Sequence, residues 1–229
     1  ALSLTILTRQ SCSQRIGESF LMLFSLQELH QKYNMEIRGI LHLGAHLGEE
    51  AQDYENLFVK NVWWVEANPH VMDKLRENLR PYNHHLIQAL LTDVDGEFRN
   101  FNITNYDGMS SSIFEFGKLH LDSSPDTQFV DTALLESRTV DSLVAEFNIT
   151  DCNFLNMDLQ GAEVLVLQGA VKTIESIDYV YTEVNIGEVY EGCGKMWQID
   201  DFLSDFDRVE TYMTPAQWGD ALYIRRSLR

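Results

Sequence analysis

The stretch GILHLGAHLGEE, residues 39–50, joins a short apolar run to a glycine-rich turn and then to a helical pattern. The apolar part, residues 39–43, is typical of a buried strand. Where a strand ends in a glycine-rich turn that opens a helix, the backbone can approach a ligand closely, and α/β sheets bind ligands at this end of their strands. The turn Gly44-Ala45-His46-Leu47-Gly48 therefore predicts a cofactor site.

The spacing of this turn narrows the kind of cofactor. It is not a P-loop, because no Gly-Lys-Ser/Thr follows it, and Gly-x-x-x-Gly differs from the dinucleotide fingerprint Gly-x-Gly-x-x-Gly. The next apolar run, residues 61–65, ends at Glu66, about 20 residues after the turn, where an acid can bond both hydroxyls of a ribose. A glycine turn with a ribose acid and no phosphate anchor suits S-adenosylmethionine better than a dinucleotide. The alternative for Glu66 is an ordinary solvated carboxylate.

Short apolar runs and helical patterns alternate along most of the chain. This alternation predicts an α/β fold with a mostly parallel sheet and helices on both faces. Strands are expected at residues 39–43, 61–65, 86–90, 153–157 and 179–184, and helices at residues 49–59, 69–79, 140–147, 162–173 and 198–206. Residues 208–213 and 220–225 are expected to form a closing hairpin, which adds an antiparallel edge to the sheet.

The remaining segments are expected to surround a single domain formed by residues 37–229. Residues 96–103 and 111–116 are expected to be extended, and the polar residues 117–132 to form an exposed loop. An amphipathic pattern over residues 15–35 predicts a helix within an N-terminal extension, residues 1–36, that packs on the core. Because the chain begins with Ala1 rather than Met, we expect it to be part of a longer polypeptide, with a glycosyltransferase as a candidate fused domain.

The charge and the cysteines limit the partners and the compartment. Lys and Arg number 17 against 35 Asp and Glu, so the net charge of −18 argues against nucleic acids and anionic membrane surfaces as partners. No apolar run approaches the ~20 residues of a membrane span, so no membrane insertion is expected. The chain has three cysteines, Cys12, Cys152 and Cys193. An odd number with no CxxC spacing indicates reduced thiols in a cytoplasmic protein.

Five blocks of the sequence resemble the FkbM family of S-adenosylmethionine-dependent methyltransferases, in the family's order and spacing. They are GILHLGAHLGEE (39–50), VWWVEANP (62–69), LTDVDGE (91–97), NFLNMDLQGAEVLVLQGA (153–170) and YTEVNIGEVYEGC (181–193). The resemblance implies a class I methyltransferase fold, which is a Rossmann-like, seven-stranded, mostly parallel sheet with an antiparallel last strand. It also implies O-methylation, commonly of sugars or other natural products.

The resemblance also implies which residues hold S-adenosylmethionine. The glycine turn would line the methionine part, Glu66 would hold the ribose, and residues 88–90 would border the adenine. The expected cofactor residues are Leu43, Gly44, Ala45, His46, Gly48, Glu49, Glu66, Ala67, Gln88, Ala89, Leu90 and Asp158. One position departs from the family pattern, because His42 stands where many members carry an Asp toward the cofactor's amino group. That contact is expected to come from Glu49 or to be absent.

Methyl transfer to a hydroxyl requires groups that align the acceptor and remove or polarise its proton. The candidate catalytic residues, expected after two neighbouring strands, are Asp158, Glu183 and Asn185. Glu183 and Asn185 are two residues apart and therefore face the same side of an extended segment. These oxygen-bearing side chains either bind Mg²⁺ or Mn²⁺, resembling catechol O-methyltransferase, or supply a metal-free general base. The third possibility is structural, since an acid such as Asp158 commonly caps a following helix.

The sequence therefore predicts an O-methyltransferase that acts on a hydroxyl of a sugar, a glycan or another small molecule. The alternatives are a methyltransferase for a non-sugar natural product or lipid, and an inactive module that only binds S-adenosylmethionine. A nicotinamide dehydrogenase is disfavoured by the missing Gly-x-Gly-x-x-Gly. Near the acceptor, the candidates are His120 in the polar loop, a cover formed by residues 110–112, and the aromatic rings of Tyr190, Trp197 and Trp218.

Overall fold

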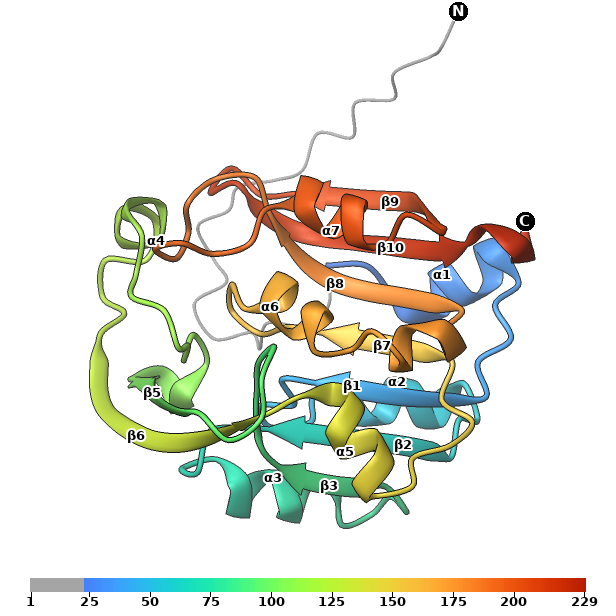
Figure 1. The fold of residues 1–229 in the computed structure, drawn as a ribbon, viewed down its shortest axis with the longest axis horizontal. Helices are drawn as coiled ribbons and strands as arrows, with labels where there is room; N and C mark the ends of the chain where they lie inside the picture. Colours follow the sequence, from blue (N-terminus) through green and yellow to red (C-terminus); the bar gives the residue numbers. More distant parts are fainter. Residues whose placement is uncertain (1–22) are drawn as a thin grey trace, which may run out of the picture.

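The computed structural model describes residues 23–229, and its central feature is a seven-stranded sheet in the order β3-β2-β1-β7-β8-β10-β9 (Figure 1). The strands of this sheet are β1 (Gly39–Leu43), β2 (Asn61–Glu66), β3 (His85–Gln88), β7 (Phe154–Met157), β8 (Tyr179–Asn185), β9 (Phe206–Met213) and β10 (Trp218–Arg225). The first five are parallel to one another, whereas β10 runs antiparallel to both of its neighbours. The expected sheet, with an antiparallel last strand, is confirmed.

The closing hairpin differs from the expected antiparallel edge. β10 pairs with β8 on one side and with β9 on the other, so the antiparallel strand lies inside the sheet and β9 forms the edge. The two strands differ in burial: the six central residues of β10 are all buried, whereas most of β9 is partly or fully exposed. The more apolar strand therefore takes the position that is covered by a strand on each side.

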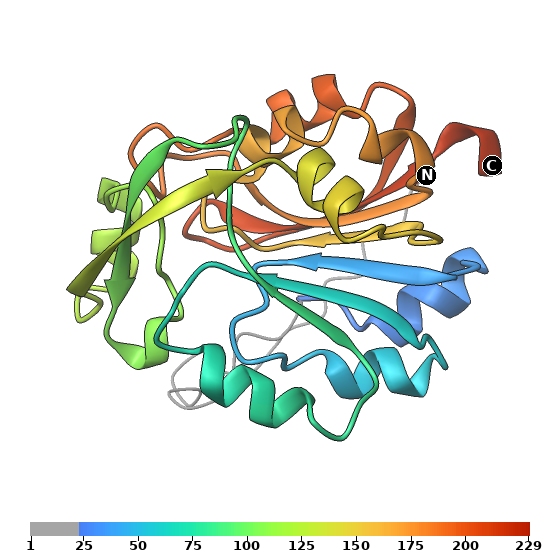
Figure 2. The same cartoon turned by 60° about the horizontal axis from the view of Figure 1, so that its bottom comes forward.

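A second, three-stranded sheet and the helix α4 lie beyond the carboxyl ends of the parallel strands (Figures 1 and 2). The sheet has the order β4-β6-β5 and consists of β4 (Leu90–Leu91), β5 (Phe98–Thr104) and β6 (Phe129–Arg138). The expected exposed loop at residues 117–132 is therefore wrong in part, because α4 (Lys118–Ser123) and the start of β6 lie within it. The rings of His120 and Phe129 both stack on Phe116, and this aromatic packing holds the polar segment against the domain.

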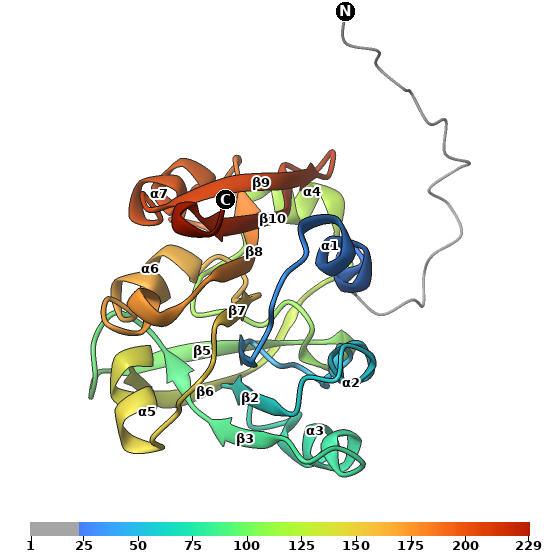
Figure 3. The same cartoon turned by 90° about the vertical axis from the view of Figure 1, so that its right-hand side faces the viewer.

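Helices cover both faces of the main sheet (Figure 3). On one face lie α1 (Leu26–Tyr33), α2 (Ala51–Asn56) and α3 (Met72–Leu79), and on the other α5 (Val140–Glu146), α6 (Glu163–Gln168) and α7 (Met196–Phe202). Each face has its own apolar layer, because side chains alternate along a strand. In β1, for example, Ile40 packs with the helices α1 to α3, and Leu41 packs with α5 to α7.

Of the helix expected at residues 15–35, the described part, residues 23–35, is helical only over α1. The Ser25 hydroxyl accepts the backbone N–H of Glu28 and caps the start of α1, and Asn34 ends the helix in a left-handed conformation. The Tyr33 hydroxyl donates to the Val209 carbonyl and thereby ties α1 to the edge strand β9. Residues 1–22 of the expected extension lie outside the described part of the chain.

Other helices, α2 and α6 among them, are also shorter than their sequence patterns. The helix α2 ends at Asn56, and Phe58 has a positive φ of 61°. The helix α6 ends before Gly169, where an added Cβ would lie 2.4 Å from the Thr92 carbonyl oxygen. Short 3₁₀ helices follow other elements at Tyr106–Gly108 (η1), Thr173–Ser176 (η2) and Arg226–Leu228 (η3). Within residues 23–229, none of the helices has the length and apolar character needed to cross a membrane.

Candidate active site

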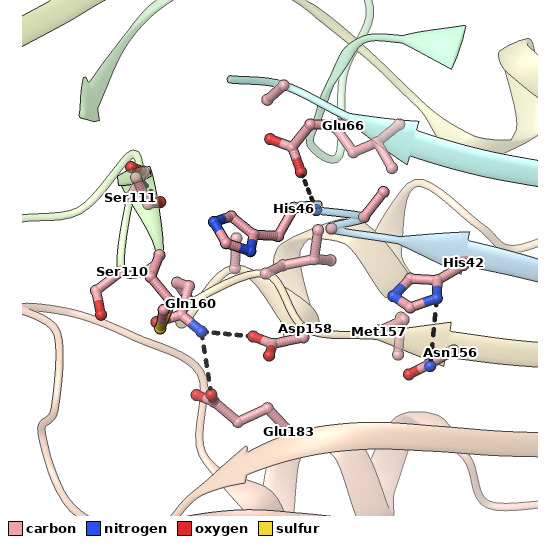
Figure 4. Close-up of a pocket in the computed structure, with 18 of the residues that line it drawn as sticks. His42, His46, Glu66, Ser110, Ser111, Asn156, Met157, Asp158, Gln160 and Glu183 are labelled. Atoms are coloured by element: carbon pink, nitrogen blue, oxygen red, sulfur yellow. Dashed lines mark hydrogen bonds between the residues drawn. The ribbon is translucent and has the colours of Figure 1, made fainter. Parts of the chain in front are cut away.

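A cavity of about 340 Å³ lies at the carboxyl ends of the parallel strands (Figure 4). Its walls come from the turns after β1, β2 and β7, from the end of β8, and from the second sheet and α4. The predicted site residues that line it are Gly44, Ala45, His46, Glu49, Glu66, Ala67, Ala89, Leu90, Asp158 and Glu183. The structure thus brings together residues that are more than 100 positions apart in the chain.

Four predicted site residues do not line this cavity. Leu43 points into the apolar layer beside α5 to α7, and Gln88 is exposed at the end of β3. Gly48 faces α3, where an added Cβ would lie 3.0 Å from Leu75 and Leu79, so its absent side chain serves helix packing. Asn185 is buried at the end of β8 and contacts Glu183 rather than the cavity.

The turn after β1 requires glycine at its first position. Gly44 has a φ of 87°, and an added Cβ would lie only 1.8 Å from the carbonyl oxygen of Asp158. The N–H groups of Gly44 and Ala45 both donate to the carbonyl of Val65, at 2.9 and 3.1 Å. The turn is therefore bonded to β2 and lies directly against the residue that follows β7, which fixes the floor of the cavity.

Glu66 is held rigidly at the end of β2. Its Oε2 accepts the N–H of His46 at 2.7 Å (Figure 4), and its Oε1 accepts the N–H of Asn68 at 2.6 Å. Burial raises the pKa of Glu66, and these two backbone N–H groups oppose that rise. Because each carboxylate oxygen can accept more than one hydrogen bond, the side chain keeps acceptor capacity for two further hydroxyls.

His42 is a neutral member of the cavity wall. Burial lowers its pKa to about 3, so the ring is uncharged near neutral pH. Its Nδ1 lies 2.8 Å from the Tyr54 hydroxyl, which also accepts a hydrogen bond from the side-chain amide of Asn156. The ring stacks on Trp64 at 4.5 Å. His42 therefore belongs to a buried aromatic cluster and supplies no carboxylate toward a cofactor.

The two acids after the glycine turn have different surroundings. Glu49 pairs with His46, whose Nδ1 lies 2.8 Å from Glu49 Oε1, and its Oε2 accepts the N–H of Leu47. Burial raises the pKa of Glu50 to about 8, and the neighbouring Glu49 adds to that rise. Glu50 lines the cavity beside Glu49, yet sequence reasoning missed it, since adjacent acids at a helix start look like solvated residues.

Gln160 joins the two predicted catalytic acids. Its Nε2 donates to Asp158 Oδ1 at 2.5 Å and lies 3.4 Å from Glu183 Oε2 (Figure 4). The Tyr190 hydroxyl donates to Gln160 Oε1, which orients the amide so that its N–H₂ group faces the acids. Asn185 Nδ2 donates to the other oxygen of Glu183 at 3.1 Å. Gln160 was also missed from the sequence, although it lies in the distinctive block 153–170.

The cavity is strongly acidic. Burial raises the pKa of Glu183 well above its usual value, and the nearby Asp158 adds to this rise. The side chain of Asp158 is accessible from the cavity, but desolvation by the surrounding protein raises its pKa as well. The carboxyl residues in the wall are Glu49, Glu50, Glu66, Asp158, Glu183 and Asp220, and no described Lys or Arg lines it. Such a site favours cationic or neutral ligands over anionic ones.

The predicted metal site at Asp158, Glu183 and Asn185 does not fit this arrangement. Mg²⁺ and Mn²⁺ need oxygen ligands that converge on one point. Here the N–H₂ groups of Gln160 and Asn185 are directed at the carboxylates, so donors stand where a cation would need acceptors. Among residues 23–229 there is also no group of three or more His, Cys, Asp and Glu side chains that could hold a metal ion.

The glycine turn and the acids that surround the cavity agree with the result of a comparison with protein families. The model of the methyltransferase FkbM domain matches residues 42–222. The chain belongs to the FkbM methyltransferase family. It is accordingly a methyltransferase that depends on S-adenosylmethionine, as the sequence predicted.

Among the relatives of this FkbM-family chain is the 2-O-methyltransferase NoeI of Sinorhizobium fredii (strain NBRC 101917 / NGR234). The two are 29% identical over 191 residues, which cover 80% of this chain and 77% of NoeI. Similar solved structures include a methyltransferase from Clostridium acetobutylicum, with 8% identity, coverage of 87% and 88%, and a TM-score of 0.48. Another is M. capricolum TrmK bound to S-adenosylhomocysteine, with 8% identity, coverage of 87% and 67%, and a TM-score of 0.45.

Proposed function

We propose that this methyltransferase transfers a methyl group from S-adenosylmethionine to a hydroxyl of a sugar or glycan. The observation that carries the proposal is the pair of acids Asp158 and Glu183, joined by Gln160 inside the cavity. Carboxyl and amide groups bind neutral hydroxyls, and the ring of Trp218 in the same wall offers an apolar face to a sugar. The relative NoeI, which is named a 2-O-methyltransferase, supports O-methylation.

The cofactor part of the proposal follows the shape of the wall. Glu66 would hold the ribose hydroxyls, and the turn from Gly44 to His46 would border the methionine part. The apolar wall for the adenine would come from the neighbouring residues Ala67, Ala89, Leu90 and Phe101. S-adenosylmethionine supplies a methyl group on a positively charged sulfur, which agrees with a cavity wall rich in carboxyl groups.

Asp158 and Glu183 would position the acceptor next to that methyl group. Asp158 keeps an oxygen available to accept a hydrogen bond, because only Oδ1 is bonded to Gln160. Glu183, whose pKa is raised by burial, would be protonated and donate a hydrogen bond to the acceptor. We propose that both act without a metal ion, because the amide N–H₂ groups already face their oxygens.

A methyl-transfer screen tests the proposed function. Free sugars and glycan-linked sugars would be incubated with S-adenosylmethionine, in EDTA and in added Mn²⁺, and the methylated product would be located by mass spectrometry and NMR. We expect methylation of a sugar hydroxyl that is unchanged by EDTA. Transfer only to a lipid or other natural product would refute the sugar acceptor. Loss of activity in EDTA with recovery in Mn²⁺ would restore the metal mechanism.

An inactive protein would look different in the same experiment. It would bind S-adenosylhomocysteine in calorimetry and yet methylate none of the acceptors.

The acidic wall also supports the expectation that nucleic acids are not acceptors, because phosphates would face carboxyl groups such as Glu183 and Asp220. Including RNA and a nucleotide sugar in the screen tests this point, since we expect neither to be methylated.

We propose that Glu50 holds the cofactor's ammonium group in place of Glu49, whose two oxygens already pair with His46 and the N–H of Leu47, so cofactor affinity should rise with pH. Its pKa of about 8 in the free protein means that it is largely protonated at pH 6.5 and largely ionised at pH 8.5. Only the ionised form pairs with the cofactor's ammonium group, so affinity should fall by up to about tenfold for each pH unit below 8. Calorimetry with S-adenosylhomocysteine in buffers of different ionisation enthalpy would measure both the affinity and the released proton. Glu50→Gln should flatten the dependence, whereas an equally steep curve in this variant would exclude Glu50 as the source.

A further inference from the structure

Asp220 is a buried acid in the cavity wall with one free carboxylate oxygen. It lies on β10, is only 7% exposed, and lines the cavity. Its Oδ2 accepts two hydrogen bonds, one from the Tyr181 hydroxyl and one from the N–H of Leu23 at 2.8 Å. Its Oδ1 is bonded to no described residue, and it does not belong to the fully buried polar atoms that lack a partner. This oxygen therefore keeps surface that a ligand in the cavity can reach.

The strand pairing places Asp220 directly beside Glu183. In the antiparallel pair of β10 and β8, Asp220 stands opposite Glu183, so both side chains lie on the same face of the sheet (Figure 1). The Cβ atoms of such a pair are about 4.5–5.5 Å apart. On the other side of β8, Met157 pairs with Thr182, which places Asp158 next to Glu183. Three carboxyl groups thus form a row across the ends of the neighbouring strands β7, β8 and β10.

This row leads from the cofactor turn toward the far side of the cavity. At one end, the turn at Gly44 closely approaches the carbonyl of Asp158. At the other end, Asp220 lies two strands beyond β7. Trp218 is two residues before Asp220 on β10, so the two side chains project from the same face of the strand, and both line the cavity. A sugar ring that packs on Trp218 would therefore reach Asp220 as well as the acid pair.

We propose that Asp220 Oδ1 accepts a hydrogen bond from a second hydroxyl of the acceptor, an inference that rests on the proposed O-methylation of a sugar. The acceptor is then a polyol with at least two free hydroxyls on one ring. One hydroxyl lies beside Asp158 and Glu183 and receives the methyl group, and the other is bound by Asp220. Compounds with a single hydroxyl, and sugars already substituted at the second position, would be poor acceptors.

The charges along the row agree with this assignment. Burial raises the pKa of Asp220 to about 6, so its carboxylate is largely ionised at pH 7.5. Burial also raises the pKa of Glu183, and far enough that this neighbour is protonated and does not repel the Asp220 charge. No described Lys or Arg lines the cavity to pair with Asp220. A hydroxyl group of the acceptor can supply the hydrogen bond that Oδ1 lacks.

A series of monodeoxy acceptors tests the proposal in the wild type. Each analogue of the sugar found in the screen lacks one hydroxyl other than the methylated one, and kcat/KM is measured at pH 7.5. We expect one analogue to lower kcat/KM by about 10- to 100-fold, as for the loss of a hydrogen bond to a charged group. If every analogue is methylated as well as the parent sugar, the acceptor has no second anchor and the inference is wrong.

Asp220→Asn replaces only the free oxygen. The amide oxygen can still accept from Tyr181 and Leu23 in the place of Oδ2, while an N–H₂ group takes the place of Oδ1. The preference for the parent sugar over the sensitive analogue should shrink by at least about fivefold, because a neutral hydrogen bond is weaker. The analogue itself should keep nearly its wild-type kcat/KM, and affinity for S-adenosylhomocysteine should change by less than about 2-fold. A loss of folding would instead lower kcat/KM equally for both acceptors.

Asp200→Asn is a matched control, because Asp200 also accepts a tyrosine hydroxyl, that of Tyr223 at 2.8 Å. It lies on α7 and does not line the cavity, so this variant should keep the wild-type preference. If Asp220→Asn also keeps the full preference, Asp220 only holds Tyr181 and the segment before α1, and the inference is wrong while the proposed function stands. If the wild type methylates no sugar hydroxyl in the screen, the proposed function fails and this inference fails with it.

Discussion

Asp158→Ala and Glu183→Gln should each lower methyl transfer by about 10³-fold. In Asp158→Ala, the Gln160 amide loses its partner at 2.5 Å, and the cavity loses an acceptor beside the reacting groups. In Glu183→Gln, one carboxyl oxygen becomes an N–H₂ group that faces the N–H₂ of either Gln160 or Asn185. Two donors repel each other, so the acid pair would no longer hold the acceptor in line with the methyl group. The measurements are kcat and KM for a sugar acceptor found in the screen.

Two comparisons separate this effect from a general loss of structure. Asp122→Asn removes an exposed carboxylate that pairs with Lys118 on α4, outside the cavity, and should leave kcat unchanged. Asn185→Ala removes a hydrogen bond to Glu183 without opening the cavity wall and should cost only about tenfold. A Glu183→Gln variant with nearly normal kcat would show that Glu183 has a structural role. Calorimetry with S-adenosylhomocysteine would confirm that each variant still folds around the cofactor.

The main sheet could be predicted from the sequence because its signals are local. Each parallel strand is a short apolar run followed by a polar turn, as in residues 39–48, and such patterns need no knowledge of distant contacts. The position of β10 between β8 and β9 was not predictable in this way. Residues 208–225 form a hairpin whether β9 or β10 lies next to β8. The order of the strands depends on which of the two is buried between two neighbouring strands.

The segment at residues 117–132 was misjudged for a related reason. Its composition is polar, yet His120 and Phe129 pack on Phe116, which comes from just outside the segment. Polarity therefore indicated exposure, whereas the aromatic side chains decided the actual packing. The expected ends of α2 and α6 were too late because the helical pattern reveals neither the positive φ of Phe58 nor the close approach of Gly169 to the Thr92 carbonyl.

The site shows the same division between local and distant signals. Gly44, His46 and Glu66 were predictable, since the glycine turn and the acid have a spacing set by one strand–helix–strand unit. Gln160 was not, because its importance comes from Tyr190, which orients its amide from another part of the chain. The metal hypothesis for Asp158, Glu183 and Asn185 correctly placed two acids in the cavity, but spacing alone could not reveal the amide groups between them.

Glu66→Ala should weaken cofactor binding by about 10²-fold or more. Each hydrogen bond from a ribose hydroxyl to a charged group contributes about 1.5–3 kcal/mol, and Glu66 is placed to accept two of them. The change also leaves the N–H groups of His46 and Asn68 without the carboxylate that they bond in the wild type. Calorimetry with S-adenosylhomocysteine measures the total loss, which combines the ribose contacts with any relaxation of the turn.

A second ligand separates these two contributions of Glu66. S-adenosylhomocysteine with a 2′-deoxyribose lacks one of the hydroxyls, so the wild type should bind it about tenfold or more weakly than the normal compound. Glu66→Ala should bind both ligands with nearly equal affinity, because the partner of that hydroxyl is gone. Glu66→Asp keeps the charge but withdraws the carboxylate from the N–H groups of His46 and Asn68, and it should fall between the two. If Glu66→Ala still discriminates tenfold between the ligands, another residue holds the ribose, and Glu66 serves only to fix the turn between β1 and β2.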